Sequence, residues 1–172
     1  MEIRRAFPED LEAVTEVEAA CFPPREAATR EQFAERIERY GNHFLLLFDG
    51  GRLIGFIDGM VTDLPDLTDE MYARADMHDE SGAWQMIFGL NTLPAYRNRG
   101  YAARLVKALV RQADEENRAG VVLTCKDRMI PYYSRFGFLN EGPSPSEHGG
   151  AAWHQMRLTF GRRAEAASMA KE

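Results

Sequence analysis

The segment from residue 84 to residue 117 limits the fold most, because it predicts a strand that leads through a short turn into a long helix. Residues 84–93 are rich in Ile, Phe, Leu and Thr, which favour a central strand, and Pro94 opens the turn after it. From Tyr101 to about Asn117, apolar residues recur at helical spacing, so one face of this helix is predicted to pack inward. A chain built around this unit is predicted to be an α/β protein.

Periodicity and turn residues predict the other elements. Before this unit they are a strand at 2–6, a helix from Pro8 to about Ala20, a second helix capped by Thr29 with Gln32 in capping-box spacing, and a hairpin of strands 43–48 and 52–61. Residues 62–82 predict either a surface loop or a short irregular helix. Gly120 is expected to end the long helix, before a strand at 121–125, a short helix at 131–136 and a strand at 153–160. This order predicts a mixed sheet with helices on both faces.

Length and composition predict a single domain at 1–160, followed by a flexible tail at 161–172. The chain has 172 residues, of which 45% are hydrophobic, and this suffices for one sizeable core. The net charge of -6 argues against a nucleic-acid partner, which requires clustered Lys and Arg. Two cysteines suit a reducing cytoplasm, and the longest apolar run, 44–48, is too short to span a membrane. A cytoplasmic monomer or homodimer is expected.

The turn Arg97-Asn98-Arg99-Gly100 predicts an anion site at the start of the long helix. Gly100 allows a tight turn, and the unpaired amides of the first helical turn attract a pyrophosphate group. Arg97 and Arg99 add positive charge. The spacing differs from that of a P-loop or a Rossmann fingerprint. The other interpretation is a solvated helix start that binds nothing.

This segment also resembles the acetyl-CoA loop of the GNAT superfamily of N-acetyltransferases, whose pattern is Gln/Arg-x-x-Gly-x-Gly/Ala between the fourth strand and the third helix. The strand 87–93 precedes it as the family expects. More narrowly, residues 125–138, with their Pro-Tyr-Tyr-Ser-Arg-Phe-Gly-Phe ending, are similar to a segment of the serotonin (arylalkylamine) N-acetyltransferase subgroup. Residues 51–57 and Cys21-Phe22-Pro23 resemble that subgroup too. The resemblance covers residues 2–160.

The resemblance implies a mixed, mostly antiparallel central sheet of six to seven strands, in which the fourth and fifth are parallel and splayed. It implies acetyl-CoA as the co-substrate, bound where these strands separate. No metal is expected, because His148 and His154 lack metal-ligand spacing. The backbone of Leu90, Asn91 and Thr92 would pair with the pantetheine arm, and the Leu90 amide would polarise the thioester carbonyl. Other cofactor residues would be Arg97, Asn98, Arg99, Gly100, Tyr101, Ala102 and Ala103 at the pyrophosphate, and Thr124, Cys125 and Lys126 beside the gap.

The resemblance also implies a general acid. Tyr133 matches the tyrosine with which the family protonates the departing thiolate, and a positioned phenol can do this. The alternative is that Tyr133 packs on the sheet, as Tyr132 is expected to do.

The general base departs from the family pattern. Two strand histidines of the vertebrate enzymes align with Met86 and Phe88, which cannot accept a proton. Glu26 lies at a point comparable to a glutamate of insect relatives and is the predicted base. The alternative is that Glu26 is only an exposed residue of a polar loop. The reserve candidates are His78, Asp79 and Glu80.

These features predict an N-acetyltransferase that moves an acetyl group from acetyl-CoA to a small primary amine by direct attack on the thioester. An aromatic acceptor pocket would suit an arylalkylamine, with Phe22, Pro23, Phe56, Trp84 and Phe88 as its residues. A polyamine or a peptide N-terminus stays open as the acceptor. The hypothesis from a different class is a non-catalytic acetyl-CoA-binding module that has lost the base.

Overall fold

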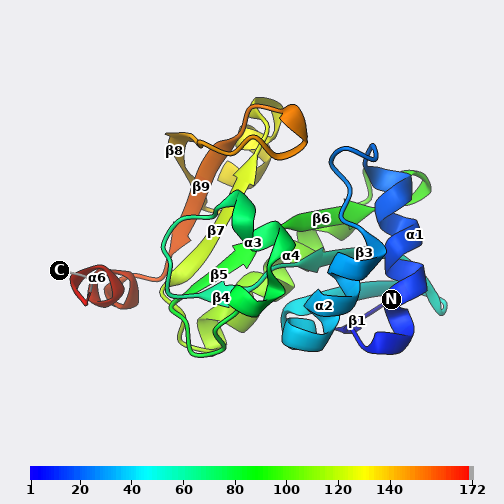
Figure 1. Cartoon of the computed structure of the whole chain (residues 1–172), viewed down its shortest axis with the longest axis horizontal. Coiled ribbons are helices and arrows are strands. Elements are labelled where there is room, and N and C mark those ends of the chain that lie inside the picture. Colours follow the sequence, from blue (N-terminus) through cyan, green and yellow to red (C-terminus); the bar gives the residue numbers. More distant parts are fainter. Residues whose placement is uncertain (171–172) are drawn as a thin grey trace.

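The structure is a computed structural model that describes residues 1–170. Within these residues, nine strands form two sheets (Figure 1). The strands are β1 (Glu2–Arg5), β2 (Phe44–Asp49), β3 (Arg52–Asp58), β4 (Val61–Thr62), β5 (Trp84–Ile87), β6 (Gly89–Thr92), β7 (Gly120–Cys125), β8 (Leu139–Pro143) and β9 (His154–Thr159). The helices are α1 (Leu11–Cys21), α2 (Arg30–Tyr40), α3 (Asp69–Ala73), α4 (Tyr101–Glu115), α5 (Ile130–Ser134) and α6 (Arg162–Met169).

The predicted mixed sheet with one parallel pair is confirmed. The first sheet has the order β1-β2-β3-β6 and is antiparallel throughout. The second has the order β4-β5-β7-β9-β8, in which β5 and β7 run parallel and the other neighbours antiparallel. There are more strands than the predicted six to seven, because two predicted strands each divide in two and β8 was not predicted.

The predicted continuous strand at 84–93 is wrong, because the chain changes sheets at Phe88. β5 pairs with β7, whereas β6 pairs with β3. The adjacent strand is interrupted at Gly59, between β3 and β4. A Cβ atom at Gly59 would lie 1.8 Å from the Met86 carbonyl oxygen, so only glycine allows the two backbones to approach this closely. Past this break the sheets separate, and the edge of β6 toward β7 has no partner strand in the described chain.

Helices cover both faces of the first sheet, as predicted. α1 and α2 pack on one face and α4 on the other (Figure 1). Strand alternation divides the core accordingly, since Phe44 and Leu46 of β2 pack with α1 and α2, and Leu45 and Leu47 pack with α4. A third apolar cluster on the second sheet includes residues of α3 and α6.

Helix ends follow local signals, with one correction. The Thr29 hydroxyl accepts a hydrogen bond from Gln32 N (3.1 Å), and the Gln32 side chain accepts one from Thr29 N (2.9 Å), so the capping box is confirmed. The long helix ends at Glu115 and not at Gly120. Asn117 supplies the left-handed turn with a φ of 62°, and Gly120 begins β7.

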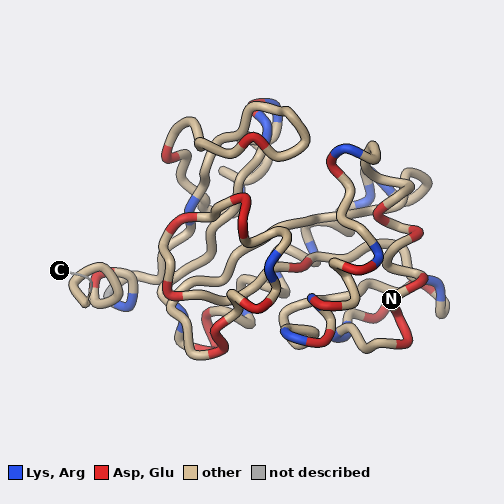
Figure 2. Tube along the Cα trace, viewed as in Figure 1, with Lys and Arg blue, Asp and Glu red and all other residues tan. Residues whose placement is uncertain are grey.

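Residues 62–82 contain both irregular chain and short helices, namely α3 and a 3-10 helix at 75–77. The tail, for which no element was predicted, contains α6, and Ala164 of this helix joins the third apolar cluster. Figure 2 shows Lys and Arg interspersed with Asp and Glu along the trace. Among the described residues, no helix combines the length and apolar character that crossing a membrane would require.

Candidate active site

The strand β6 directs backbone groups away from its own sheet, on the side toward β7. It ends its sheet, with β3 as its neighbour. Because Leu93 N donates to Ile54 O (2.8 Å), the alternation of an antiparallel pair turns the peptide groups of Leu90 and Thr92 away from β3. Thr92 O accordingly accepts from the Arg97 side chain at 3.1 Å. An extended ligand can add to such an edge as a further strand.

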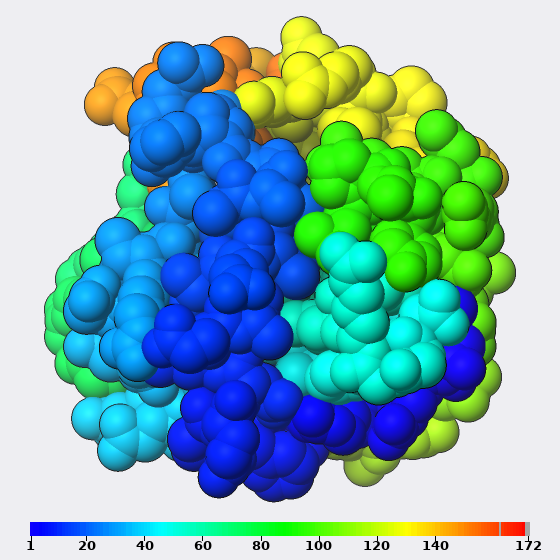
Figure 3. Space-filling view, turned by 90° about the vertical axis from the view of Figure 1, so that its right-hand side faces the viewer, coloured from blue at the N-terminus to red at the C-terminus, as the bar shows by residue number. Residues whose placement is uncertain are grey.

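The start of α4 lies next to this edge and combines positive charge with unpaired amides. Gly100 caps the helix in the left-handed conformation, with a φ of 81°, and Asn98 before it has a φ of 63°. The first helical turn holds no acidic residue, and Arg97 and Arg99 are exposed. The predicted pyrophosphate residues 98–103 therefore share one turn whose amides can bind an anion. In Figure 3 the green segment that leads to this turn lies beside the yellow segment after β7.

Three predicted cofactor residues, Thr124, Cys125 and Lys126, follow the point where β7 stops pairing with β5. Burial raises the pKa of the Cys125 thiol to about 11, and Asp127 adds to this shift. The thiol packs 3.5 Å from the Met156 sulfur. Cys125 is therefore a protonated packing residue and not a nucleophile.

Tyr133 lies in α5, next to the end of β7, and is 8% exposed. Its ring meets Tyr132 and Phe138 edge-on, with ring centroids 5.2 and 6.1 Å apart. Burial raises the pKa of the phenol, and Cys125 adds to the effect, so the hydroxyl keeps its proton. This hydroxyl makes no hydrogen bond to the described residues, which leaves its proton available. The placement fits both the acid and the packing interpretation.

A cavity of about 210 Å³ lies on the face of β6 covered by α1, and Gly89 forms part of its lining. Four aromatic side chains line it: Phe22, Tyr72, Phe88 and Trp153. Two of them, Phe22 and Phe88, were predicted for an acceptor pocket.

The other three residues predicted for that pocket lie elsewhere. Strand direction turns Phe56 into the core against Phe33, with ring centroids 5.7 Å apart, and Trp84 into the third apolar cluster. Both are fully packed, so their assignment to the pocket is corrected. Pro23 is exposed on the loop after α1, outside the cavity lining.

Buried polar groups that the sequence analysis missed surround the cavity floor. Arg36 Nη1 donates to Asp58 Oδ2 at 3.0 Å. The Glu18 carboxylate accepts from Asn91 Nδ2 and from Ala28 N, each at 2.7 Å. Burial raises the pKa of Glu18, and burial raises that of Asp58 to about 6 although Arg36 opposes the shift. A carboxyl group with this pKa can exchange a proton near neutral pH.

A sequence signal for this network existed. Glu18 follows Val14 and Val17 on the buried side of α1, and Asp58 ends the apolar strand β3. Charged residues at positions where the pattern requires apolar ones are rarely buried without a partner or a function.

Glu26, the predicted base, is buried at the cavity rim and forms an ion pair with Lys126, with Oε1 and Nζ 2.7 Å apart. The loop 144–153 covers this side of the cavity. Its His148 Nε2 lies 3.0 Å from the Glu26 carbonyl oxygen, and the His148 ring stacks on Tyr72 at 4.4 Å between centroids. The ion pair and the loop together hold Glu26 in place.

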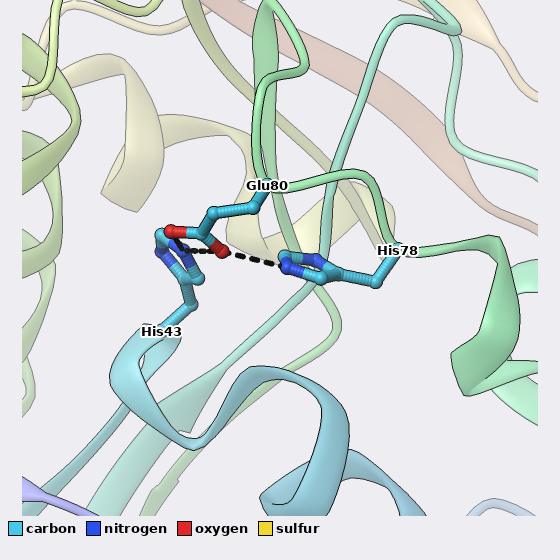
Figure 4. Close-up of side chains that lie close together, drawn as sticks. All are labelled: His43, His78 and Glu80. Atoms are coloured by element: carbon cyan, nitrogen blue, oxygen red, sulfur yellow. Dashed lines mark hydrogen bonds and ion pairs between the residues drawn. The ribbon is translucent and has the colours of Figure 1, made fainter.

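The reserve base candidates lie outside the cavity. Glu80 is hydrogen-bonded to His43 Nε2 (2.9 Å) and His78 Nε2 (2.7 Å) (Figure 4), and Asp79 is exposed. His78 Nδ1 accepts from the Val61 N–H (3.0 Å), so the proton of neutral His78 is on Nε2 and points to Glu80. A nitrogen that carries this proton has no lone pair for a metal ion, and the geometry describes a hydrogen-bonded cluster.

Comparisons with known proteins agree with this geometry. Residues 11–138 match the family described as "Acetyltransferase (GNAT) family". The chain is similar to "Serotonin N-acetyltransferase" from Mesocricetus auratus, at 27% identity in an alignment of 168 residues that covers 92% of this chain and 77% of that protein.

Solved structures share the fold. One is the loading GNATL domain of CurA from Lyngbya majuscula, with a TM-score of 0.81 and 18% identity over 92% of this chain and 96% of that chain. Another is the GphF GNAT-like decarboxylase in complex with isobutyryl-CoA, with a TM-score of 0.79 and 21% identity over 92% and 99% of the two chains. A third is the PaiA N-acetyltransferase from Thermoplasma acidophilum in complex with coenzyme A, with a TM-score of 0.69 and 18% identity over 92% and 98%.

Proposed function

The chain belongs to the acetyltransferase (GNAT) family, and we propose that it transfers the acetyl group of acetyl-CoA to a small primary amine. The observation that carries this proposal is the position of β6. Its free edge lies in the gap beside α4, and its face under α1 borders a cavity of aromatic and acidic side chains. A thioester bound along the edge and an amine bound in the cavity would meet at this strand.

For the donor, we propose the binding residues that the family resemblance implies. The pantetheine arm would lie along the peptide groups of 90–92, and the pyrophosphate on 98–103 with Arg97 nearby. Residues 124–126 would form the opposite wall. The proposal is supported by the free edge of β6, by the unpaired amides of α4, and by similar folds that were solved with coenzyme A or an acyl-CoA.

For the acceptor, we propose a compact cationic amine with an aromatic group. Carboxyl groups border the cavity and attract an ammonium ion, and they repel an anionic acceptor. They belong to Glu18, Glu26, Asp58 and Asp69. The aromatic rings offer cation–π contacts and an apolar wall. The volume of about 210 Å³ is below the usual ~300–1,000 Å³ of ligand pockets, which favours an arylalkylamine over a long polyamine or a peptide.

For the leaving group, we propose that Tyr133 gives its proton to the departing thiolate. The phenol is protonated and makes no other hydrogen bond to the described residues, and it lies beside the end of β7. Tyr133→Phe should therefore lower kcat about 100-fold or more without weakening coenzyme A binding. Full turnover by this variant would remove Tyr133 from the mechanism.

The proposed function is tested by a panel of amines assayed for release of free coenzyme A. We would use 2-phenylethylamine, spermidine and a dipeptide with a free N-terminus, and identify the acetylated product by mass spectrometry. Turnover of 2-phenylethylamine is expected. Tight acetyl-CoA binding without turnover of any amine would instead favour a non-catalytic acetyl-CoA-binding module.

A further inference from the structure

Two buried oxygen atoms beside the cavity have no hydrogen-bond partner in the described chain. They are Asp58 Oδ1 and Asn91 Oδ1, and both residues are 1% exposed. The two atoms converge on Gly89, because a Cβ atom there would lie 3.0 Å from Asp58 Oδ1 and 3.3 Å from Asn91 Oδ1. Asp58 and Gly89 both line the cavity. Buried acceptors without donors are unfavourable, so this geometry points to a ligand that supplies hydrogen-bond donors.

The surrounding contacts hold both oxygens in this direction. Arg36 engages the other carboxylate oxygen of Asp58, and Glu18 accepts from the amide nitrogen of Asn91. Neither side chain can turn its free oxygen away without losing a buried hydrogen bond. An ammonium group carries three donors and a positive charge, whereas a hydroxyl supplies one donor and an anion none. The oxygens therefore favour an ammonium ion.

We propose, on the basis of the acetyltransferase function above, that Asp58 Oδ1 and Asn91 Oδ1 bind the ammonium group of the acceptor and that Asp58 removes its proton. The absence of a side chain at Gly89 leaves the room for this group. Gly89 is adjacent in β6 to Leu90, whose peptide group is proposed to hold the thioester carbonyl. An amine bound here would lie next to the acetyl carbon.

The transfer balances as follows. One ammonium proton passes to Asp58 Oδ1, and the nitrogen lone pair then forms the N–C bond with the acetyl carbon. When the C–S bond breaks, the sulfur takes the electron pair and receives the Tyr133 proton. The second nitrogen proton restores the phenol, through solvent where needed, and Asp58 releases the first proton to water. The products are the amide, free coenzyme A and one proton.

Glu26 and Asp58 each have a cationic partner, Lys126 and Arg36 respectively. Asp58 suits this role better, because its second oxygen, Oδ1, has no partner in the described chain and lies beside Gly89. Burial raises the pKa of Asp58 to about 6, so it is mainly ionised at pH 7 and can accept a proton. The titratable or charged groups around it come from every element that borders the cavity: Glu18 of α1, Arg36 of α2, Asp69 and Tyr72 of α3, Glu26 of the loop after α1, and His148 of the loop 144–153. Activity is expected to fall as the pH falls through about 6.

The first test measures kcat/KM for 2-phenylethylamine between pH 5 and pH 9 in the wild type and Asp58→Asn. We expect a loss of about 100-fold or more at pH 7 and disappearance of the acidic limb. Glu70→Gln is the matched control, because it changes an exposed carboxylate of α3 that pairs with Arg74. This variant should keep the wild-type kcat/KM at pH 7 and the acidic limb of the pH profile. A loss below threefold, or a limb that disappears in Glu26→Gln or His148→Gln instead, overturns the role of Asp58.

The second test needs no turnover and separates this inference from the proposed function. Calorimetry compares the binding of 2-phenylethylamine with that of the neutral 2-phenylethanol. Asp58→Asn should weaken amine binding about tenfold or more and leave the alcohol and coenzyme A unaffected. Gly89→Ala places a methyl group 3.0 Å from Asp58 Oδ1, so it should weaken the binding of both the amine and the alcohol and leave coenzyme A unaffected. Thermal denaturation checks that both variants are folded. Unchanged amine binding in both variants overturns the subsite, even where the wild type acetylates the amine.

Discussion

The buried pair between Arg36 and Asp58 gives a stability prediction that depends on pH. Arg36→Met keeps an apolar stem of similar length and removes the guanidinium, which donates to Asp58 Oδ2 (3.0 Å) and to Tyr72 O (2.9 Å). The side chains of Arg36 and Asp58 are 5% and 1% exposed, so water cannot replace these contacts. The substitution leaves one carboxylate without its cation and one carbonyl without its donor.

The magnitude follows from the pKa of Asp58, which burial raises from 3.8 to about 6. Because the folded pKa exceeds the unfolded one, the contribution of Asp58 to stability is complete below pH 3.8 and is lost as the pH rises through about 6. Removing Arg36 also removes the charge that opposes the effect of burial, so the pKa of Asp58 rises further and the variant protonates Asp58 more readily at pH 7. A further rise of one pKa unit lowers the free energy of unfolding at pH 7 by about 1.4 kcal/mol. The unpaired Tyr72 carbonyl lowers it by a further amount of about 1–3 kcal/mol.

Arg36→Met should therefore lower the free energy of unfolding by about 2–4 kcal/mol at pH 7, and by about 1.4 kcal/mol less at pH 5, where Asp58 is protonated in both proteins. Urea denaturation followed by far-UV circular dichroism measures both values. The control compares the free energies of unfolding of Asp58→Asn and the double variant Arg36→Met/Asp58→Asn. Because residue 58 cannot titrate in either protein, the difference between them should be the same at both pH values. A loss below 1 kcal/mol at pH 7, or an equal loss at both pH values in Arg36→Met, would refute this reasoning.

Thr29→Ala should lower the Tm by about 2–4 °C, since losing this N-cap costs about 1 kcal/mol; an unchanged Tm in scanning calorimetry would contradict the capping role. Gly100→Val should weaken coenzyme A binding about tenfold, because a β-branched residue is strained by about 1–2 kcal/mol at a φ of 81°. Calorimetry measures this affinity, and the control is Arg111→Ala, an exposed change on the same helix that should bind coenzyme A normally. Normal affinity in Gly100→Val would count against the anion site. His148→Ala should raise the KM for the amine and leave coenzyme A affinity unchanged, because the ring stacks on Tyr72 at the cavity; a normal KM would exclude this loop from acceptor binding.

Features with local causes could be predicted from the sequence. The capping box at Thr29 depends on residues three positions apart, and the left-handed turn at Gly100 depends on one turn and the helix that follows. The break in the strand at Phe88 was missed because its cause is not local. It depends on the close approach of Gly59 to the Met86 carbonyl, which a run of apolar residues does not reveal.

The cavity and the buried polar groups beside it depend even more on tertiary contacts. Glu18 and Asn91 are 73 positions apart in the chain, and Arg36 and Asp58 are 22 positions apart, so only the folded packing brings each pair together. Aromatic composition alone could not separate Phe88, which lines the cavity, from residues that strand register turns into the core.

The short strand β6 has a consequence for how such a chain can diversify. On the proposed assignment, its donor edge acts through peptide groups that every amino acid possesses, whereas its acceptor face depends on the absence of a side chain at Gly89 and on the side chain of Asn91. Substitutions at these two positions can change acceptor preference while donor binding persists. Insertion or deletion of one residue shifts the alternation and disrupts both surfaces together. β6 is thus tolerant of altered chemistry and intolerant of altered length.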